Sequence, residues 1–374
     1  MMAILVLEDG RVFRGEPFGA LGEAYGEAVF ATGISGYQET LTDPSYHGQV
    51  VIATAPHIGN TGWNDEDDES GRIWVAGYVV RDPAPRPSNW RAARSLDDEL
   101  VTQGIVGIRG VDTRALTRHL RDNGVMRVGI SSTQDDPAVL LERVLAQPLI
   151  TGAELIGQVT TGQPYVVPAL GVRKCTVAAL DLGIKANTSR ELAERGVEVH
   201  VLPAGSTFEE LTAMAPDGVL FSNGPGDPGT ATHAVDLARQ VLAADLPVFG
   251  ICLGHQVLAR AMGLGTYKLK YGHRGMNQPV LDRASNRIDI TSHNHGFAVE
   301  APGSELIETE FGTVHVSHVS LNDDVVEGLE LNRDGRLRAI TVQYHPEAAA
   351  GPHDAEYLFD HFIDLMTANQ GRVR

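Results

Sequence analysis

The sequence has little of what would assign it to several large classes of protein. Its 374 residues include only two cysteines, Cys175 and Cys252, which can form one disulfide at most. So little cysteine is typical of a reducing compartment, and we expect a cytoplasmic protein. Residues 1–10 lack the basic start of a leader peptide, and no apolar run is long enough to span a bilayer. We therefore expect no association with a membrane.

Positive charge is also scarce. The chain has 48 acidic and 30 basic side chains, a formal net charge of −18, and no basic tract, which disfavours nucleic acids as partners. It contains neither a Gly-x-x-x-x-Gly-Lys-Ser/Thr loop nor a Gly-x-Gly-x-x-Gly motif after a strand, so nothing indicates a nucleotide cofactor. Small molecules or other proteins are the expected partners, and chemistry that consumes ATP would need another chain.

The length of the chain and a change of pattern near residue 170 predict two domains. Residues 1–160 have short strand-like runs separated by Gly and Pro turns, with a helix over 113–122, and we expect a smaller, mixed α/β domain. Residues 161–172 hold two prolines, two glycines and no clear periodicity, as a linker would. In residues 173–371 strands and helices alternate regularly, which predicts a doubly wound, mostly parallel α/β sheet. The expected strands are 175–180, 197–202, 218–221, 247–251 and one from 337, and the expected helices are 186–195, 208–214, 233–243 and 256–262.

Cys252 lies in the most informative segment, residues 250–256, which read Gly-Ile-Cys-Leu-Gly-His-Gln directly after an expected strand. A nucleophile on a sharp strand-to-helix turn needs small residues on both sides, as in the Gly-x-Ser-x-Gly elbow. The sulfur would lie near a helix N-terminus, where the dipole favours thiolate. A free cysteine is also commonly a small buried apolar residue, so this segment alone leaves both interpretations open.

Two other segments follow strands of the same expected sheet, and ligands of such sheets bind at the carboxyl ends of the strands. Residues 224–228, Gly-Pro-Gly-Asp-Pro, are either an ordinary turn or a loop whose exposed amides bind an oxyanion. His345 and Glu347 are two residues apart, so in an extended chain they share a face, and a carboxylate can then orient an imidazole that deprotonates a thiol. The three segments together favour a catalytic cysteine.

Metal binding is the weaker interpretation of the remaining histidines and acids. His293 and His295 alternate, and His315 and His318 follow, but no recognised zinc spacing is present. The acidic run at residues 65–69 lacks the spaced ligands of a calcium loop and is expected to be a solvated loop. We therefore expect no metal in this chain.

The segments at 224–228, 250–256 and 345–347 resemble the motifs of the class I, triad-type glutamine amidotransferases. The N-terminal half narrows the resemblance to the small, glutaminase subunits of carbamoyl-phosphate synthases. Segments similar to those of that family are 7–10, 36–46, 56–60, 112–114, 294–299 and 351–354. The resemblance covers nearly the whole chain.

This resemblance implies a role for each matching residue. Cys252 would attack the side-chain amide of L-glutamine, His345 would act as base and then acid, and Glu347 would orient His345. The amides of Gly224 and Leu253 would hold the oxyanion. The implied glutamine-binding residues are Ser45, Gly224, Gly226, Leu253, Gln256, Asn294, Gly296 and Phe297.

The same resemblance implies a partner. The N-terminal domain would dock to a large subunit, which would bind ATP and Mg and use the ammonia to make carbamoyl phosphate from bicarbonate, for arginine and pyrimidine synthesis. Three alternatives remain: a cysteine peptidase, a glutaminase that serves another synthase, such as one that makes anthranilate or GMP, and a non-catalytic regulatory subunit.

Overall fold

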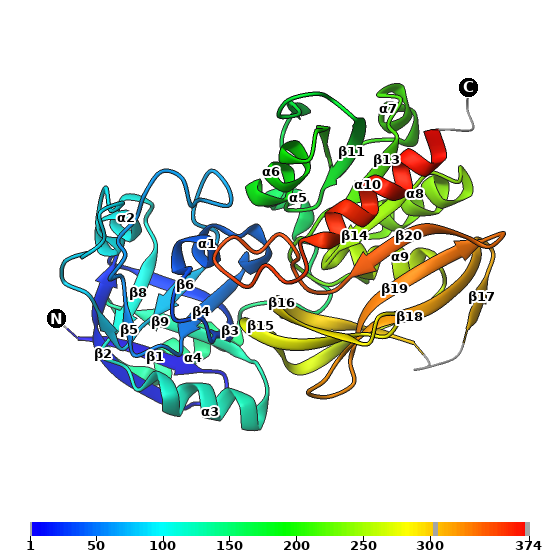
Figure 1. Ribbon diagram of the computed structural model, residues 1–374. Helices are drawn as coiled ribbons and strands as arrows, with labels where there is room; N and C mark the ends of the chain where they lie inside the picture. Colours follow the sequence, from blue (N-terminus) through cyan, green and yellow to red (C-terminus); the bar gives the residue numbers. More distant parts are fainter. Residues whose placement is uncertain (1, 302–305, 371–374) are drawn as a thin grey trace. The chain divides into compact units, whose positions relative to one another are not determined.

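The computed structural model describes residues 2–301 and 306–370, so the predicted domain ends at residues 1 and 371 lie outside the described residues. Contacts within the chain divide it into two units (Figure 1). The first comprises residues 1–153 and 270–275, and the second comprises residues 154–269 and 276–374. None of the helices in the described part of the chain is both long and apolar enough to cross a membrane.

The first unit is built on a closed barrel. Its strands follow the order β1-β2-β8-β6-β4-β3-β9. Their bounds are β1 Ala3–Leu7, β2 Val12–Gly19, β3 Glu23–Ala31, β4 Gln49–Ala53, β6 Gly77–Val79, β8 Val106–Arg109 and β9 Arg127–Ser131, and β5 (His57–Ile58) pairs with β7 (Asp82–Pro83) outside the barrel. Strand β1 is buried throughout because Leu5 faces the barrel core while Ile4 and Val6 pack on Leu140 of helix α4 (Pro137–Leu145).

The helices of this unit are α1 (Tyr37–Thr42), α2 (Leu96–Thr102), α3 (Thr113–Asn123) and α4, with a 3₁₀ turn, η1, at Pro44–Tyr46. Helix α3 was predicted at 113–122. The Asp112 side chain accepts a hydrogen bond from the Ala115 amide at 3.0 Å, and Gly124 ends the helix with φ 98°. Both end signals are therefore confirmed.

The acidic run at residues 65–69 is paired with arginines and is not a simple solvated loop. Arg91 binds Asp67 at 2.6 Å and Glu66 at 2.9 Å, and Arg94 binds Asp65 at 2.6 Å. Ion pairs with arginines about 25 residues further along the chain therefore hold this loop in place. The sequence of the acidic run alone does not reveal these partners.

The second unit contains an eleven-stranded sheet in the order β10-β12-β11-β13-β14-β20-β19-β16-β15-β18-β17. The five strands from β12 to β20 are parallel to one another, as predicted. They are β11 (Cys175–Asp181), β12 (Val197–Pro203), β13 (Gly218–Phe221), β14 (Val248–Ile251) and β20 (Arg336–Val342). The connections β11–β12, β12–β13 and β13–β14 are helical, and each returns the next strand in the same direction. Strand β20 instead follows an antiparallel strand along the chain.

Helices cover both faces of the parallel strands (Figure 1). Helices α7 (Phe208–Ala213), α8 (Thr232–Ala243) and α9 (Leu253–Ala261) pack on one face, and α6 (Ala186–Glu194) and α10 (Tyr357–Gln370) on the other. Alternate residues of one strand enter the two cores: on β13, Phe221 belongs to the first and Leu220 to the second. A strand buried on both sides reads as a continuous apolar run, and this explains the 218–221 pattern.

Two features differ from the sequence-based expectations. The segment expected to be a linker, 161–172, contains the edge strand β10 (Tyr165–Val167), which pairs antiparallel with β12, and it follows a short helix, α5 (Ile156–Val159). Beyond β20 the sheet continues with antiparallel strands, whose alternating pattern carried no clear signal. These are β15 (Gly265–Asp282), β16 (Arg287–Glu300), β17 (Ile307–Thr309), β18 (Gly312–Ser320) and β19 (Val326–Arg333).

Candidate active site

Cys252 occupies a strained turn between β14 and α9. Its backbone angles φ and ψ are 53° and −103°, a conformation that residues other than glycine rarely adopt. Helix α9 begins at the next residue, three positions earlier than the sequence predicted. The sulfur is therefore presented at the helix N-terminus and at the carboxyl end of a central parallel strand, the position of a nucleophile elbow.

The glycines on either side of Cys252 are required by close packing. A Cβ on Gly254 would lie 2.0 Å from the carbonyl oxygen of Phe221, and one on Gly250 would lie 2.5 Å from the Leu258 side chain. The Gly254 amide donates to the Ser222 carbonyl at 3.0 Å, which joins the elbow to the loop after β13.

His345 and Glu347 follow β20, the strand beside β14, so the expected pair lies at the same sheet edge as Cys252. Nδ1 of His345 lies 2.8 Å from Oε1 of Glu347. Nε2 is buried and has no hydrogen-bond partner among the described residues. It is therefore the ring nitrogen available to exchange a proton with the thiol. The amide of His345 donates to the Ser292 carbonyl at 2.9 Å, and this bond brings β16 to the site.

Burial and charge shift the pKa values of this pair strongly. Burial and Lys185 both act to lower the pKa of His345, but Glu347 and Cys252 outweigh them and raise it to about 10. Burial acts to raise the pKa of Glu347, whereas Lys185 and His345 lower it to about 2. At neutral pH the His345 ring is therefore a cation held by the Glu347 carboxylate.

Lys185 and Asn187 are site residues that the sequence-based analysis missed. Nζ of Lys185 lies 2.8 Å from Oε1 of Glu347, with both side chains almost fully buried, and the Asn187 side-chain amide donates to the backbone carbonyl of Glu347. Both lie just after β11, at the same sheet edge as the other site residues. The signal in the sequence that indicates both residues is their position after a parallel strand, where ligands of such sheets bind.

The loop after β13 lies against the elbow. A Cβ on Gly224 would be 2.1 Å from the Leu182 carbonyl and 3.0 Å from the Leu253 side chain, so Gly224 and Leu253 are neighbours. Gly226 has φ 96°, which favours glycine. The predicted oxyanion residues thus come together, although their contact with a substrate stays a prediction.

The remaining predicted glutamine-binding residues of the second unit lie on α9 and β16. The sulfur of Cys252 is 3.8 Å from the Asn294 carbonyl oxygen, and the Asn294 side-chain nitrogen is buried without a hydrogen-bond partner in the described structure. The Gln256 amide donates to the Phe297 carbonyl and to Gln343, each at 2.9 Å. Gln256 therefore ties α9 to β16, and Gly296 lies between Asn294 and Phe297 on that strand.

Ser45 belongs to the first unit, where it is buried in η1 and its amide donates to Asp43 at 2.8 Å. Its contact with glutamine stays a prediction. Cys175, the second cysteine, is buried at the start of β11, and both cysteines are free.

The doubly wound sheet and its cysteine elbow are those of a class I glutamine amidotransferase domain. Residues 178–365 match the family described as "Glutamine amidotransferase class-I". Residues 5–130 match the family described as "Carbamoyl-phosphate synthase small chain, CPSase domain".

Relatives of the same name match the chain over nearly its full length. The carbamoyl phosphate synthase small chain of Streptomyces coelicolor is 62% identical over 97% of this chain and 96% of its own length. That of Streptomyces avermitilis is 63% identical over the same shares, and that of Mycobacterium tuberculosis is 61% identical over 99% of both chains. The chain belongs to the family of carbamoyl phosphate synthase small chains. The resemblance and the fold class inferred from the sequence are confirmed, and the match over 5–130 separates the chain from glutaminases of other synthases.

Proposed function

We propose that the chain hydrolyses L-glutamine to glutamate and ammonia, with Cys252 as nucleophile. The observation that carries this proposal is the position of Cys252, on a strained elbow at the same sheet edge as the His345–Glu347 pair. A buried imidazolium and carboxylate beside a cysteine are the parts that amide hydrolysis needs.

The proposed reaction has two steps. The Cys252 thiolate attacks the carbonyl carbon of the glutamine side chain, and the amides of Gly224 and Leu253 hold the resulting oxyanion. The carbon–nitrogen bond then breaks, ammonia leaves with a proton from His345, and a thioester remains on Cys252. Water, deprotonated by His345, attacks the thioester and releases glutamate and the free thiolate. Glu347 and Lys185 keep the ring oriented throughout.

Glutamate release from glutamine tests this assignment. We expect activity in the wild type and in Cys175→Ala, and none in Cys252→Ala, because the two buried cysteines differ in their position on the sheet. Each protein is assayed with and without the large chain of the synthase. Glutamate release that persists in Cys252→Ala would remove Cys252 as nucleophile, and an inactive wild type with its large chain present would favour a regulatory subunit.

The ammonia has to reach a second chain. By the family relationship, a large chain that binds ATP and Mg would join the ammonia to bicarbonate and form carbamoyl phosphate, a precursor for arginine and pyrimidine synthesis. The proposed hydrolysis of glutamine uses no cofactor in the small chain.

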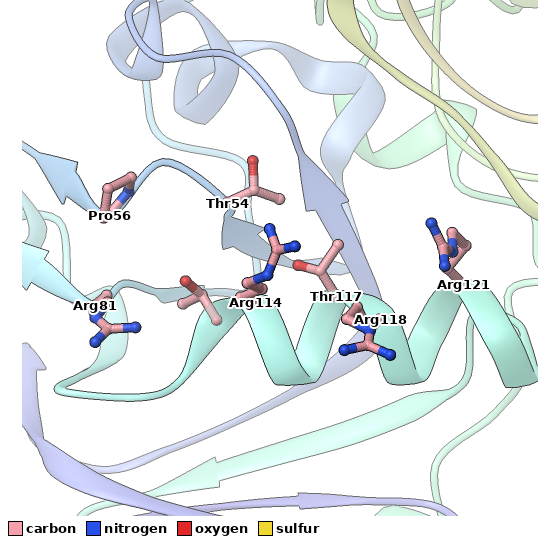
Figure 2. Close-up of a pocket in the computed structure, with 8 residues that line it drawn as sticks. Thr54, Pro56, Arg81, Arg114, Thr117, Arg118 and Arg121 are labelled. Atoms are coloured by element: carbon pink, nitrogen blue, oxygen red, sulfur yellow. The ribbon is translucent and has the colours of Figure 1, made fainter.

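The first unit offers a surface for that partner. A pocket of about 660 Å³ is lined by arginines, three of them on α3 (Figure 2). In the described part of the chain, Arg81, Arg114 and Arg118 take part in no ion pair. Arg121 forms an exposed ion pair with Asp122 at 3.6 Å. Exposed cations that stay unpaired in so acidic a chain favour a partner with carboxylates at its surface. We propose that the large chain docks here.

A further inference from the structure

Two histidines and a glutamate converge in the antiparallel part of the second unit, outside the proposed catalytic groups. His293 and His295 are two residues apart on β16 and therefore share one face of the strand, and Glu327 lies on β19, which pairs with β16. All three residues are buried, with exposed fractions of 2%, 4% and 0%. Their candidate ligand atoms all lie within 4.8 Å of one another.

The hydrogen bonds around the two rings assign their protons. The Thr291 hydroxyl donates its one proton to the Gln278 carbonyl at 2.8 Å, so its oxygen accepts from Nε2 of His293 at 2.7 Å. Nδ1 of His295 donates to the Phe297 carbonyl at 2.9 Å. Each neutral ring then directs a lone pair inward, from Nδ1 of His293 and from Nε2 of His295. Metal-ligating histidines are held in this way, with the outer nitrogen bound to a carbonyl or hydroxyl.

The distances between the inward atoms fit one metal ion. Nδ1 of His293 and Nε2 of His295 are 3.2 Å apart, and two nitrogens that share a tetrahedral zinc at its usual bond length lie about 3.3 Å apart. The two Glu327 oxygens each lie 3.7 Å from one of these nitrogens. The Glu327 carboxylate would have to move only a few tenths of an ångström closer to these nitrogens to act as the third ligand.

We propose that His293, His295 and Glu327 bind one divalent transition-metal ion of the zinc type. Imidazole and carboxylate are ligands that zinc accepts. A further ligand, water or another side chain, would complete four-coordination.

The ion would have a structural role. It would fasten β16 to β19 on the face of β16 opposite Asn294, whose carbonyl lies beside the Cys252 sulfur. The ring of His293 also lies 6.0 Å from that of Tyr344, the residue before His345. This proposal does not depend on the proposed glutaminase activity.

Cobalt binding tests the site directly. The full chain with Cys252→Ala is used, so that the thiol cannot act as a ligand and catalysis plays no part. After removal of metals with a chelator, we expect Co²⁺ to bind with one equivalent per chain and to give the visible absorption of a four-coordinate ion. His293→Gln and Glu327→Gln should weaken this binding by at least about 100-fold, because each removes a ligand and loss of outer-shell support alone costs 10–100-fold.

The matched control is His315→Gln. His315 and Glu330 also form a histidine–glutamate pair in the same sheet, at 3.3 Å, but they supply only one imidazole. We expect unchanged cobalt binding in this variant. Binding that persists in a folded His293→Gln, Glu327→Gln double variant would overturn the proposal.

A measurement on the parent chain covers the case in which the variants do not fold. Stoichiometric Zn²⁺ should raise the unfolding temperature of the metal-free chain, because it binds the folded state only, and Mg²⁺ should not. The absence of both the zinc effect and a cobalt spectrum would show that the three side chains share protons instead of a metal.

Discussion

At the scale of single residues, the backbone of Cys252 connects sequence to chemistry. A positive φ at a residue with a side chain is unfavourable by about 1–3 kcal/mol and persists only where the surroundings enforce it. Here the surroundings include two close contacts that only glycine allows. Gly250 on β14 packs against the Leu258 side chain, and Gly254 on α9 packs against the Phe221 carbonyl. The two glycines therefore help to fix the backbone conformation that positions the Cys252 sulfur.

Gly254→Ala tests this dependence. A Cβ 2.0 Å from the Phe221 carbonyl forces the elbow or β13 to move, and we expect a loss of unfolding free energy of about 3 kcal/mol together with a loss of glutamate release. Denaturant unfolding and the glutaminase assay measure the two effects. Gly205→Ala is the control, since nothing lies within 4 Å of its Cβ and its φ is not positive. Equal stability of the two variants would contradict the packing argument.

The charge on His345 depends on Glu347. In Glu347→Gln the carboxylate that raises the pKa is gone, while burial and Lys185 continue to lower it. We expect the His345 ring, followed by NMR of its imidazole protons, to titrate far below its wild-type pKa of about 10. Glu330→Gln, in the same sheet, should leave that titration unchanged. A wild-type pKa retained in Glu347→Gln would mean that another group holds the proton.

The same shifts predict how stability depends on pH. Because the pKa of His345 is raised from 6.5 to about 10, its contribution is complete below pH 6.5 and is lost as the pH rises towards 10. Because the pKa of Glu347 is lowered from 4.5 to about 2, its contribution is complete above pH 4.5 and is lost as the pH falls towards 2. Glu347→Gln should remove much of the wild-type loss of stability between pH 6.5 and 10 in unfolding experiments.

At the scale of elements, the sequence predicts whatever repeats locally. The strands β11, β12, β13 and β14 were found within one residue at each end, because parallel strands buried on both faces are short apolar runs bounded by helices and turns. Their carboxyl ends share one edge, so the convergence of the loop at Gly224, the elbow and His345 followed from order alone. The helix after Cys252 begins three residues before the predicted start at 256, because Leu253, Gly254 and His255 already belong to its first turn.

Contacts between residues far apart in the sequence could not be predicted from local patterns. The closed barrel of the first unit joins β1 to β9, more than a hundred residues apart, and no local period encodes such a partner. Lys185 reaches Glu347 across 162 positions. Glu327 is an ordinary acid in the sequence, and only the pairing of β19 with β16 makes it a neighbour of His293.

Helix α3, which carries the arginine pocket, offers a test at this scale. Asp112→Ala removes the cap that accepts from the Ala115 amide, and we expect a loss of about 1 kcal/mol of unfolding free energy. Asp122→Ala, on the exposed last turn of the same helix, should change it by less than about 0.5 kcal/mol and in the stabilising direction, because an acid there opposes the helix dipole. Denaturant unfolding compares both variants, and similar losses would refute the capping role.

At the scale of the whole molecule, the distribution of charge is uneven. A net charge of −18 keeps polyanions away and favours solubility. In the acidic run at 65–69, Asp65, Glu66 and Asp67 pair with Arg91 and Arg94. The arginines that line the pocket on α3 (Figure 2) are exposed. If the large chain docks at this pocket as proposed, the arginines would attract its carboxylates while the acidic remainder of the surface would repel them, which would orient the two chains.

The double variant Arg118→Glu, Arg121→Glu tests this surface. Both side chains are exposed and neither belongs to the proposed catalytic groups, so we expect unchanged glutamate release by the isolated chain. Reversal of two charges replaces attraction by repulsion at the interface, and binding to the large chain, measured by calorimetry, should weaken by about tenfold or more at low salt. The difference should shrink as salt rises, because exposed charges are screened. Arg336→Glu, an exposed reversal at the start of β20 in the second unit, is the control and should bind as the wild type does. An affinity that the double variant shares with Arg336→Glu at every salt concentration would mean that the large chain docks elsewhere.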